Sequence, residues 1–239
     1  MQRRSTGWQR GTTMSKTLYL ECYSGISGDM TVAALLDLGA DREVLKESLK
    51  SLPVGGFRTE ITRVKKSGLD ACDFSVILEQ DNHDHDMEYL HGSEKSYTGH
   101  HEHSHEVNHE HHHGHTHSHE HPHEHRGMKE ITEIIQKSEM TARAKKMAMR
   151  VFDILAQAES KAHGVPVEEV HFHEVGAVDS IVDIAAIAIC MDNLDISNVI
   201  VPVLYEGTGF IRCQHGQIPV PVPAVTHIAE TQSSETENH

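Results

Sequence analysis

The 239-residue sequence has no long hydrophobic run, whereas a membrane-spanning helix needs about 20 consecutive apolar residues. The first 13 residues contain basic side chains with no apolar segment behind them, so they lack the pattern of a secretion signal. Met14 offers a second start, and residues 1–15 are expected to form a disordered extension. These absences favour a cytoplasmic protein with no membrane partner.

Cysteine and positive charge are also scarce. The four cysteines include no Cys-x-x-Cys pair, so neither a disulfide framework nor a zinc ribbon is predicted. There are 21 lysines and arginines against 36 aspartates and glutamates, which gives a formal net charge of −15. An acidic surface repels nucleic acid and attracts cations, so the expected partners are cations and nucleic acid is excluded as the main partner.

Aliphatic side chains are almost absent from one internal segment, residues 81–126, which holds most of the 23 histidines. We expect a disordered loop, because this composition cannot bury a core. Neutral imidazole binds borderline divalent ions, and affinity at nitrogen sites rises toward Ni²⁺ and Cu²⁺, so a multi-site, exchangeable metal store is predicted. Protons compete with metal near the ordinary imidazole pKa of about 6.5. The candidate ligands are His109, His111, His113, His115, His117 and His119.

Two alternatives stay open for this segment. The segment could instead be a polar, low-complexity linker with no function, whose histidines serve no purpose. If it does bind metal, the residue types do not separate nickel from zinc or copper.

On either side of this segment, short β-favouring runs alternate with helical periodicity. The pattern predicts helices over 28–40, 41–52, 128–138, 139–164 and 178–194, and a hairpin over 56–80 that turns at Ser67 and Gly68. We therefore predict a single α+β or α/β domain in two halves, 16–80 and 127–228, with the 81–126 loop between them and a polar tail over 229–239.

The segment "SGISGDM", residues 24–30, lies between a predicted strand and a predicted helix. Backbone N–H groups at such a turn favour a phosphate, so its small residues are candidate cofactor-binding residues and Asp29 is a candidate catalytic residue. No lysine follows, so a P-loop is excluded and a phosphotransfer enzyme lacks support. The alternative is a tight turn with Asp29 stabilising the helix dipole. The cofactor-binding candidates are Ser24, Gly25, Ser27 and Gly28.

The segment "EEVHFHEVGAVDSIVDI", residues 168–184, contains two histidines and several carboxylates. In an extended run His171 and His173 project to the same face, so they are predicted as metal ligands. Glu174 and Asp179 are predicted as catalytic carboxylates, and Asp183 follows Asp179 by one helical turn. The alternative is helix capping, either by a Ser180–Asp183 capping box or by Asp179 at the N-cap.

The segment "EGTGFIRCQHGQIPVPVPA", residues 206–224, is the fourth motif. Gly207 and Gly209 allow close approach of the backbone and are candidate cofactor-binding residues. Cys213 and His215 alternate onto one face, where a thiolate and an imidazole bind soft metals, and His215 is taken as a candidate ligand. Ordinary packing is the alternative.

Taken together, "YSGISGDM", the histidine-rich segment, "VHFHEVGAVDSIVDI" and "EGTGFIRCQHGQIPVPVPA" closely resemble the LarC family, the nickel insertion proteins of nickel-pincer nucleotide synthesis. The order and spacing agree from about Thr17 to Ala224. The resemblance implies an enzyme of the nickel chelatase type, a lyase. It would insert Ni²⁺ into pyridinium-3,5-bisthiocarboxylic acid mononucleotide, in a CTP-dependent reaction, to form the cofactor of lactate racemase and related enzymes.

The resemblance covers only the N-terminal part of the family. Full-length members continue past the "PVPVPA" region into a C-terminal domain to which CTP binding is attributed. We therefore expect this chain to be the nickel-handling part and to need a separately encoded C-terminal half. CTP and Mg²⁺ or Mn²⁺ are expected only with that half. The apo-racemase and a second copy of the chain are further candidate partners, and the alternative function is a non-enzymatic nickel or zinc store or metallochaperone.

Overall fold

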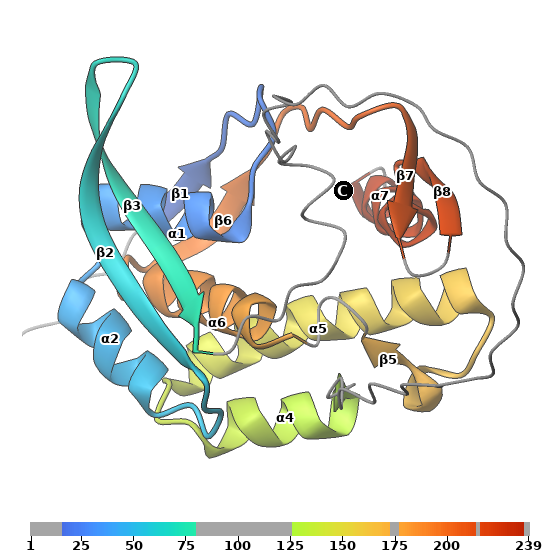
Figure 1. Cartoon of the computed structure of the whole chain (residues 1–239), viewed down its shortest axis with the longest axis horizontal. Helices are drawn as coiled ribbons and strands as arrows, with labels where there is room; N and C mark the ends of the chain where they lie inside the picture. Colours follow the sequence, from blue (N-terminus) through green and yellow to red (C-terminus); the bar gives the residue numbers. More distant parts are fainter. Residues whose placement is uncertain (1–15, 80–125, 173–176, 214–215, 237–239) are drawn as a thin grey trace, which may run out of the picture.

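The structure, a computed structural model, describes residues 16–79, 126–172, 177–213 and 216–236 (Figure 1). The expected disordered extension and the expected histidine-rich loop fall outside these ranges, apart from Arg126 at the end of the latter. Within them the fold is mixed α+β, as predicted from the alternation of helical and strand patterns. None of the described helices is long and apolar enough to cross a membrane.

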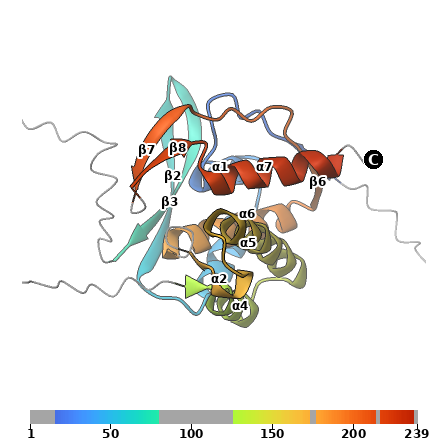
Figure 2. The ribbon, with the colours of Figure 1, turned by 90° about the vertical axis from the view of Figure 1, so that its right-hand side faces the viewer.

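The described helices match the predicted ones, with one addition at the end of the chain. They are α1 (Gly28–Asp37), α2 (Arg42–Lys50), α4 (Met128–Lys137), α5 (Ala142–His163), α6 (Val178–Asn193) and α7 (Pro223–Thr236), with a 3₁₀ turn at Val167–Glu169. The segment expected as a polar tail from residue 229 is helical as far as Thr236. Helix α7 begins at a proline, which suits the first helical position, and packs against α5 (Figure 2).

The described strands form four two-stranded sheets. Strand β1 (Lys16–Tyr19) pairs in parallel with β6 (Ile196–Ile200), although almost the whole chain separates them. The other three pairs are antiparallel: β2 (Phe57–Lys66) with β3 (Leu69–Leu78), β4 (Arg126–Gly127) with β5 (His171–Phe172), and β7 (Gly209–Cys213) with β8 (Gly216–Val220).

Helix α6 lies at the centre of the core and packs against α1, α2, α5 and β3 (Figure 1). Its sequence is apolar on almost every side, and Ile181, Val182 and Ala185 are completely buried. Burial also raises the pKa of the Cys190 thiol to about 12, so this cysteine is an inert part of the core. Strand β3 covers one side of α6, and helices cover its other sides.

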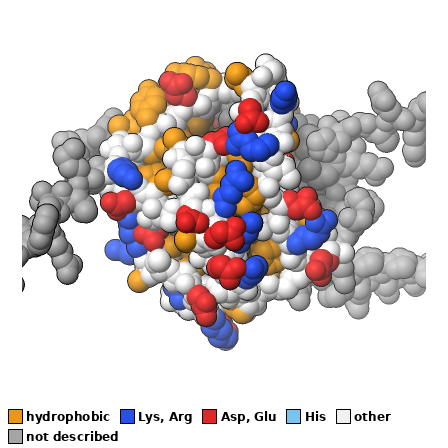
Figure 3. All heavy atoms as spheres, turned by 90° about the vertical axis from the view of Figure 1, so that its left-hand side faces the viewer, with side chains coloured by type: hydrophobic (Ala, Val, Ile, Leu, Met, Phe, Trp, Pro, Cys, Tyr) orange, Lys and Arg blue, Asp and Glu red, His pale blue; other side chains and the backbone are white. Residues whose placement is uncertain are grey.

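The β2–β3 hairpin covers one face of α1. Ser67 and Gly68 both have positive φ, 50° and 84°, as a two-residue turn between twisted strands requires. Phe74 and Cys72 pack inward, and Arg63, the strand partner of Cys72 on the same face of the hairpin, forms ion pairs with Asp37 of α1 and with Asp70. On the face that this hairpin and α2 form, positive and negative side chains are interspersed, so neither sign forms a broad patch there (Figure 3).

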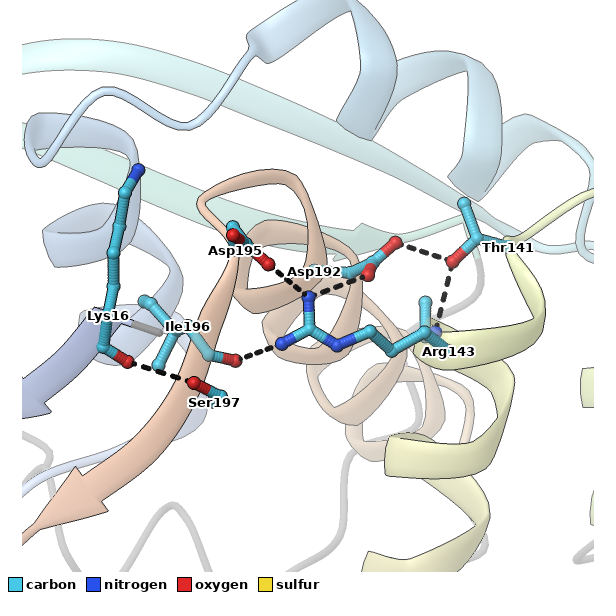
Figure 4. Close-up of polar contacts among 8 residues, drawn as sticks. Lys16, Thr141, Arg143, Asp192, Asp195, Ile196 and Ser197 are labelled. Atoms are coloured by element: carbon cyan, nitrogen blue, oxygen red, sulfur yellow. Dashed lines mark hydrogen bonds and ion pairs between the residues drawn. The ribbon is translucent and has the colours of Figure 1, made fainter. Parts of the chain in front are cut away.

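A polar cluster around Arg143, in the first turn of α5, fixes the connection from α6 to β6 (Figure 4). The guanidinium donates to the carbonyl oxygen of Ile196 at 2.5 Å and to the carboxylates of Asp195 at 3.0 Å and Asp192 at 3.3 Å. Thr141, the N-cap of α5, donates its hydroxyl to Asp192 at 2.5 Å. These contacts position the first residue of β6, and therefore the strand that pairs with β1.

We predict that Arg143→Gln destabilises the fold by about 1–3 kcal/mol, because charge-assisted hydrogen bonds to two carboxylates and a carbonyl are lost. Urea unfolding measures the difference. The control is Arg150→Gln on the same helix, an exposed arginine whose replacement is expected to change stability by less than about 0.5 kcal/mol. Equal effects of the two substitutions would contradict the role assigned to Arg143.

Candidate functional site

The parallel pairing of β1 and β6 brings the first and fourth sequence motifs together. Beyond the strands, the Leu20 N–H donates to the Ile200 carbonyl at 2.9 Å, and Cys22 forms a parallel bridge with Leu204. The rings of Tyr23 and Tyr205 lie 6.2 Å apart between centroids. Because the carboxyl ends of parallel strands lie at the same edge of a sheet, the loops that carry the glycines of both motifs meet there.

The glycines of the first and fourth motifs are required for different structural reasons. Gly25 has φ of 84° and donates its N–H to the Cys22 carbonyl at 3.1 Å, so it closes a tight turn before α1. Gly209 has φ of 109°, and a β-carbon at Gly207 would lie 3.2 Å from a methyl group of Val220. Conformation and close packing therefore account for these positions, and phosphate binding by them stays a prediction.

The first and third motifs meet where α1 contacts α6. Gly28 is the first residue of α1, and a β-carbon there would lie only 2.8 Å from the β-carbon of Asp183. No real β-carbon fits at that distance, so glycine is required. The Asp183 carboxylate accepts a hydrogen bond from the backbone N–H of Asp29. A carboxylate of α6 thus binds the N-terminus of α1, where the helix dipole favours negative charge.

Three carboxylates interact in this region: Asp29, Asp179 and Asp183. Burial, followed by the negative charges of Asp29 and Asp179, raises the pKa of Asp183 to about 6, although the hydrogen bond from the Asp29 backbone opposes the rise. The Oδ1 atom of Asp183 is buried and has no hydrogen-bond partner. The Asp29 carboxylate accepts the Ser27 hydroxyl and the Met30 N–H, the latter at 2.8 Å. Burial and mutual repulsion therefore disfavour the negative charge of this cluster, so binding of a proton or a cation would stabilise it.

Sequence reasoning placed Asp29 and Asp179 among the catalytic candidates but not Asp183. The spacing of Asp183 from Asp179 could have identified it, because residues four apart lie on one face of a helix. The capping alternative for this motif was wrong. Helix α6 begins at Val178 after Ala177, which forms no side-chain cap, so Asp179 and Ser180 both lie inside the helix. The dipole role proposed for Asp29 agrees with its place in the first turn of α1.

The second and third motifs meet at the β4–β5 pair. Gly127 lies opposite His171, and Arg126 lies opposite Phe172, so the residue after the histidine-rich segment is held beside the "VHFHE" motif. His171 is exposed, as a ligand must be, while Phe172 is buried. The contacts at this pair, between α1 and α6, and between β1 and β6 connect all four motifs in one domain.

Several predicted ligands lie outside the described residues: His173 and Glu174, His215, and the six histidines from His109 to His119. Within the described part of the chain, no group of three or more His, Cys, Asp or Glu residues is arranged to hold a metal ion. The described carboxylates therefore do not form a complete metal site by themselves, and the ligand set stays a prediction.

The fold and the site define a mixed α+β protein in which a glycine turn and an acidic cluster adjoin the carboxyl ends of two parallel strands. The chain belongs to the nickel insertion protein family, whose model matches residues 18–239. This confirms the family resemblance drawn from the four motifs.

Relatives that carry the full name "pyridinium-3,5-bisthiocarboxylic acid mononucleotide nickel insertion protein" support the assignment. The protein of Alkaliphilus metalliredigens is 52% identical over 216 residues, which cover 90% of this chain and 46% of the relative. That of Clostridium acetobutylicum is 45% identical, covering 89% of this chain and 49% of the relative. The chain thus spans about half the length of the curated relatives it matches. No solved structure matches the chain significantly.

We predict that Gly28→Ala lowers stability by about 1–3 kcal/mol, because the added methyl group collides with Asp183. The matched control is Gly55→Ala, since nothing lies within 4 Å of a β-carbon at that position. Urea unfolding of both variants tests the contact. A Gly28 variant as stable as the Gly55 variant would show that α1 and α6 do not approach this closely in solution.

A pH prediction follows from Asp183. Its folded-state pKa of about 6 lies above the ordinary 3.8, so the folded protein binds this proton more tightly than the unfolded chain does. Its contribution to stability is therefore present below about pH 4 and is lost as the pH rises through 6. Asp183→Asn, which stays neutral, is expected to gain stability relative to the parent over that range in urea unfolding. Exposed Asp153→Asn is the control. A difference independent of pH would contradict the raised pKa.

Proposed function

We propose that this chain collects Ni²⁺ and delivers it to pyridinium-3,5-bisthiocarboxylic acid mononucleotide, as the nickel-handling half of a nickel insertion enzyme. The observation that carries the proposal is the meeting of the four motifs: Gly28 against Asp183, Cys22 beside Leu204, and Gly127 opposite His171. Membership of the nickel insertion protein family and the names of the relatives support nickel as the ion and the mononucleotide as its acceptor.

The first part of the proposed path is nickel capture. The histidines from His109 to His119 bind Ni²⁺ reversibly, because many weak imidazole sites exchange ions among themselves. The end of that segment lies beside His171 through the β4–β5 pairing. His171 and His173 then receive the ion as neighbouring imidazole ligands, and His215 is a further candidate from the fourth motif.

The second part is transfer. Asp29, Glu174 and Asp179 are proposed as carboxylates that ligate nickel in transit, with Asp183 as the protonatable member beside them. Oxygen ligands hold Ni²⁺ less strongly than sulfur does, so the thiocarboxylate groups of the mononucleotide can take the ion from them. Burial, and then repulsion by Asp29 and Asp179, raise the pKa of Asp183, and a bound cation lowers it by offsetting that repulsion.

The third part is recognition of the mononucleotide phosphate. Ser24, Gly25 and Ser27 precede α1, Gly28 is its first residue, and Gly207 and Gly209 lie just before and at the start of β7. Backbone N–H groups of these residues are proposed to bind the phosphate. Asp29 and Asp183 repel an anion at this place unless a cation or a proton compensates. Phosphate binding is therefore proposed to follow nickel binding.

The proposed enzyme is a nickel chelatase of the lyase class whose CTP-dependent step, with Mg²⁺ or Mn²⁺, needs the other half of the full-length relatives. The glycine turn contains no lysine to offset triphosphate charge. That half, supplied by a separate chain or by a continuation of this one, and the apo-racemase are the proposed protein partners. Metal storage is the second candidate, since the histidine-rich segment alone would suffice for it.

The test separates nickel transfer from bulk nickel binding. We expect His171→Ala/His173→Ala to abolish cofactor formation, because the two neighbouring imidazoles that receive the ion are lost. Bulk nickel binding is expected to be nearly unchanged, since the histidine-rich segment is intact. Activation of an apo-lactate racemase measures transfer in the presence of CTP, Mg²⁺, the apo-pincer nucleotide and the C-terminal half of the A. metalliredigens relative, and calorimetry measures bulk binding.

His163→Ala/His227→Ala, which removes two histidines of α5 and α7, is the matched control and is expected to behave as the parent does. Deleting residues 81–125 is expected to leave nickel transfer intact when nickel is plentiful. If the protein were only a metal store, the same deletion would remove its nickel binding and leave no transfer to measure. Cofactor formation by the His171/His173 double variant at the parental rate would show that these residues are structural.

A further inference from the structure

Exposed apolar side chains gather along β1, β6 and the loops that follow them. Five of them define the surface that we name the β1–β6 apolar surface: Tyr19, Tyr23, Ile200, Leu204 and Tyr205. Each is between 48% and 58% exposed, although large apolar side chains are normally found inside a fold. Soluble monomers seldom expose a continuous apolar patch of this kind without an interaction to cover it.

The members of this surface are neighbours in space. Tyr19 lies opposite Ile200 in the parallel register, Leu204 continues beside Cys22, and the Tyr23 and Tyr205 rings are 6.2 Å apart. The surface therefore runs from the sheet to the loop that precedes α1.

The sheet itself is incomplete as a structural unit. Parallel sheets normally have several strands and are covered on both faces, and a two-stranded sheet is marginally stable by itself. Among the described residues, β1 pairs only with β6, so each of these strands has one edge without a strand beside it. An unpaired edge next to exposed apolar side chains is the arrangement that accepts an added strand.

We propose that the β1–β6 apolar surface binds the part of the full-length relatives that lies beyond the matched region. The chain corresponds to 46% of the A. metalliredigens protein and 49% of the C. acetobutylicum protein, so about half of each relative is available to cover it. The surface also reaches the loop before α1, where the glycine turn contains no lysine to offset the triphosphate charge of the proposed reaction. The inference rests on the proposed need for that other half, and it assigns the place where the two parts meet.

The experiment mixes this 239-residue chain with the separately produced second half of the A. metalliredigens relative and measures association by sedimentation and calorimetry. Leu204→Asp is expected to weaken a one-to-one complex at least about tenfold, because it places a charge in a desolvated interface. Leu69→Asp is the matched control, since Leu69 is 73% exposed at the far tip of the hairpin, and it is expected to bind as the parent does. Equal affinity of the two variants would overturn the proposal.

Hydrogen exchange supplies a second measurement. Amides of residues 199–205 are expected to exchange more slowly in the complex than in the chain alone, whereas those of 67–70 stay unchanged. Because β6 is already paired with β1, the comparison is between the chain alone and the complex, and equal protection of 199–205 in both overturns the proposal. If protection in the chain alone grows with concentration, the occupant is a second copy, and if it does not, the occupant is another segment of the same chain.

If the separate halves do not associate, a chimera in which the second half follows this chain gives the decisive comparison. Equal exchange of 199–205 in the chimera and in the chain alone would overturn the assigned surface. None of these measurements involves nickel, so a failure of nickel transfer with an intact complex would count against the proposed function and leave the docking surface standing.

Discussion

The burial of α6 is the constraint on which the rest of the fold depends. A helix that is apolar on nearly every side cannot lie on a surface, so α1, α2, α5 and β3 surround it. This packing places the first turns of α6 against the N-terminus of α1, and it places the end of α6 where Arg143 fixes the start of β6. The candidate site and the β1–β6 sheet are therefore both consequences of covering one helix.

The polar side of the same contact has a cost. Asp183 stabilises the N-terminus of α1 through the Asp29 N–H, yet it is partly buried and faces two other carboxylates. A fold selected only for stability would replace this residue, because a neutral side chain avoids the repulsion. A carboxylate cluster under such conditions is typical of a site that binds protons or cations.

The proposed nickel handling and the proposed docking place different demands on the surface of the protein. A cation is attracted by the net charge of −15 and by the acidic cluster, whereas a protein partner is bound by apolar side chains such as Tyr23 and Leu204. The two features adjoin at the loop that precedes α1. Such an arrangement lets a partner cover the place where the ion and the mononucleotide are proposed to meet, and so exclude water from it.

The sequence by itself determined the element types, since helical periodicity and the Ser67–Gly68 turn act within a few residues, and it identified the family through four motifs in order. Helix α7 was missed as a whole, because its polar residues show no periodicity and packing on α5 supports it. Only the tertiary structure decided that β1 lies beside β6, that Gly28 meets Asp183 and that His171 lies opposite Gly127. Those contacts join residues far apart in the chain. They are stabilised by the burial of α6 as a whole, and a local sequence pattern cannot predict them.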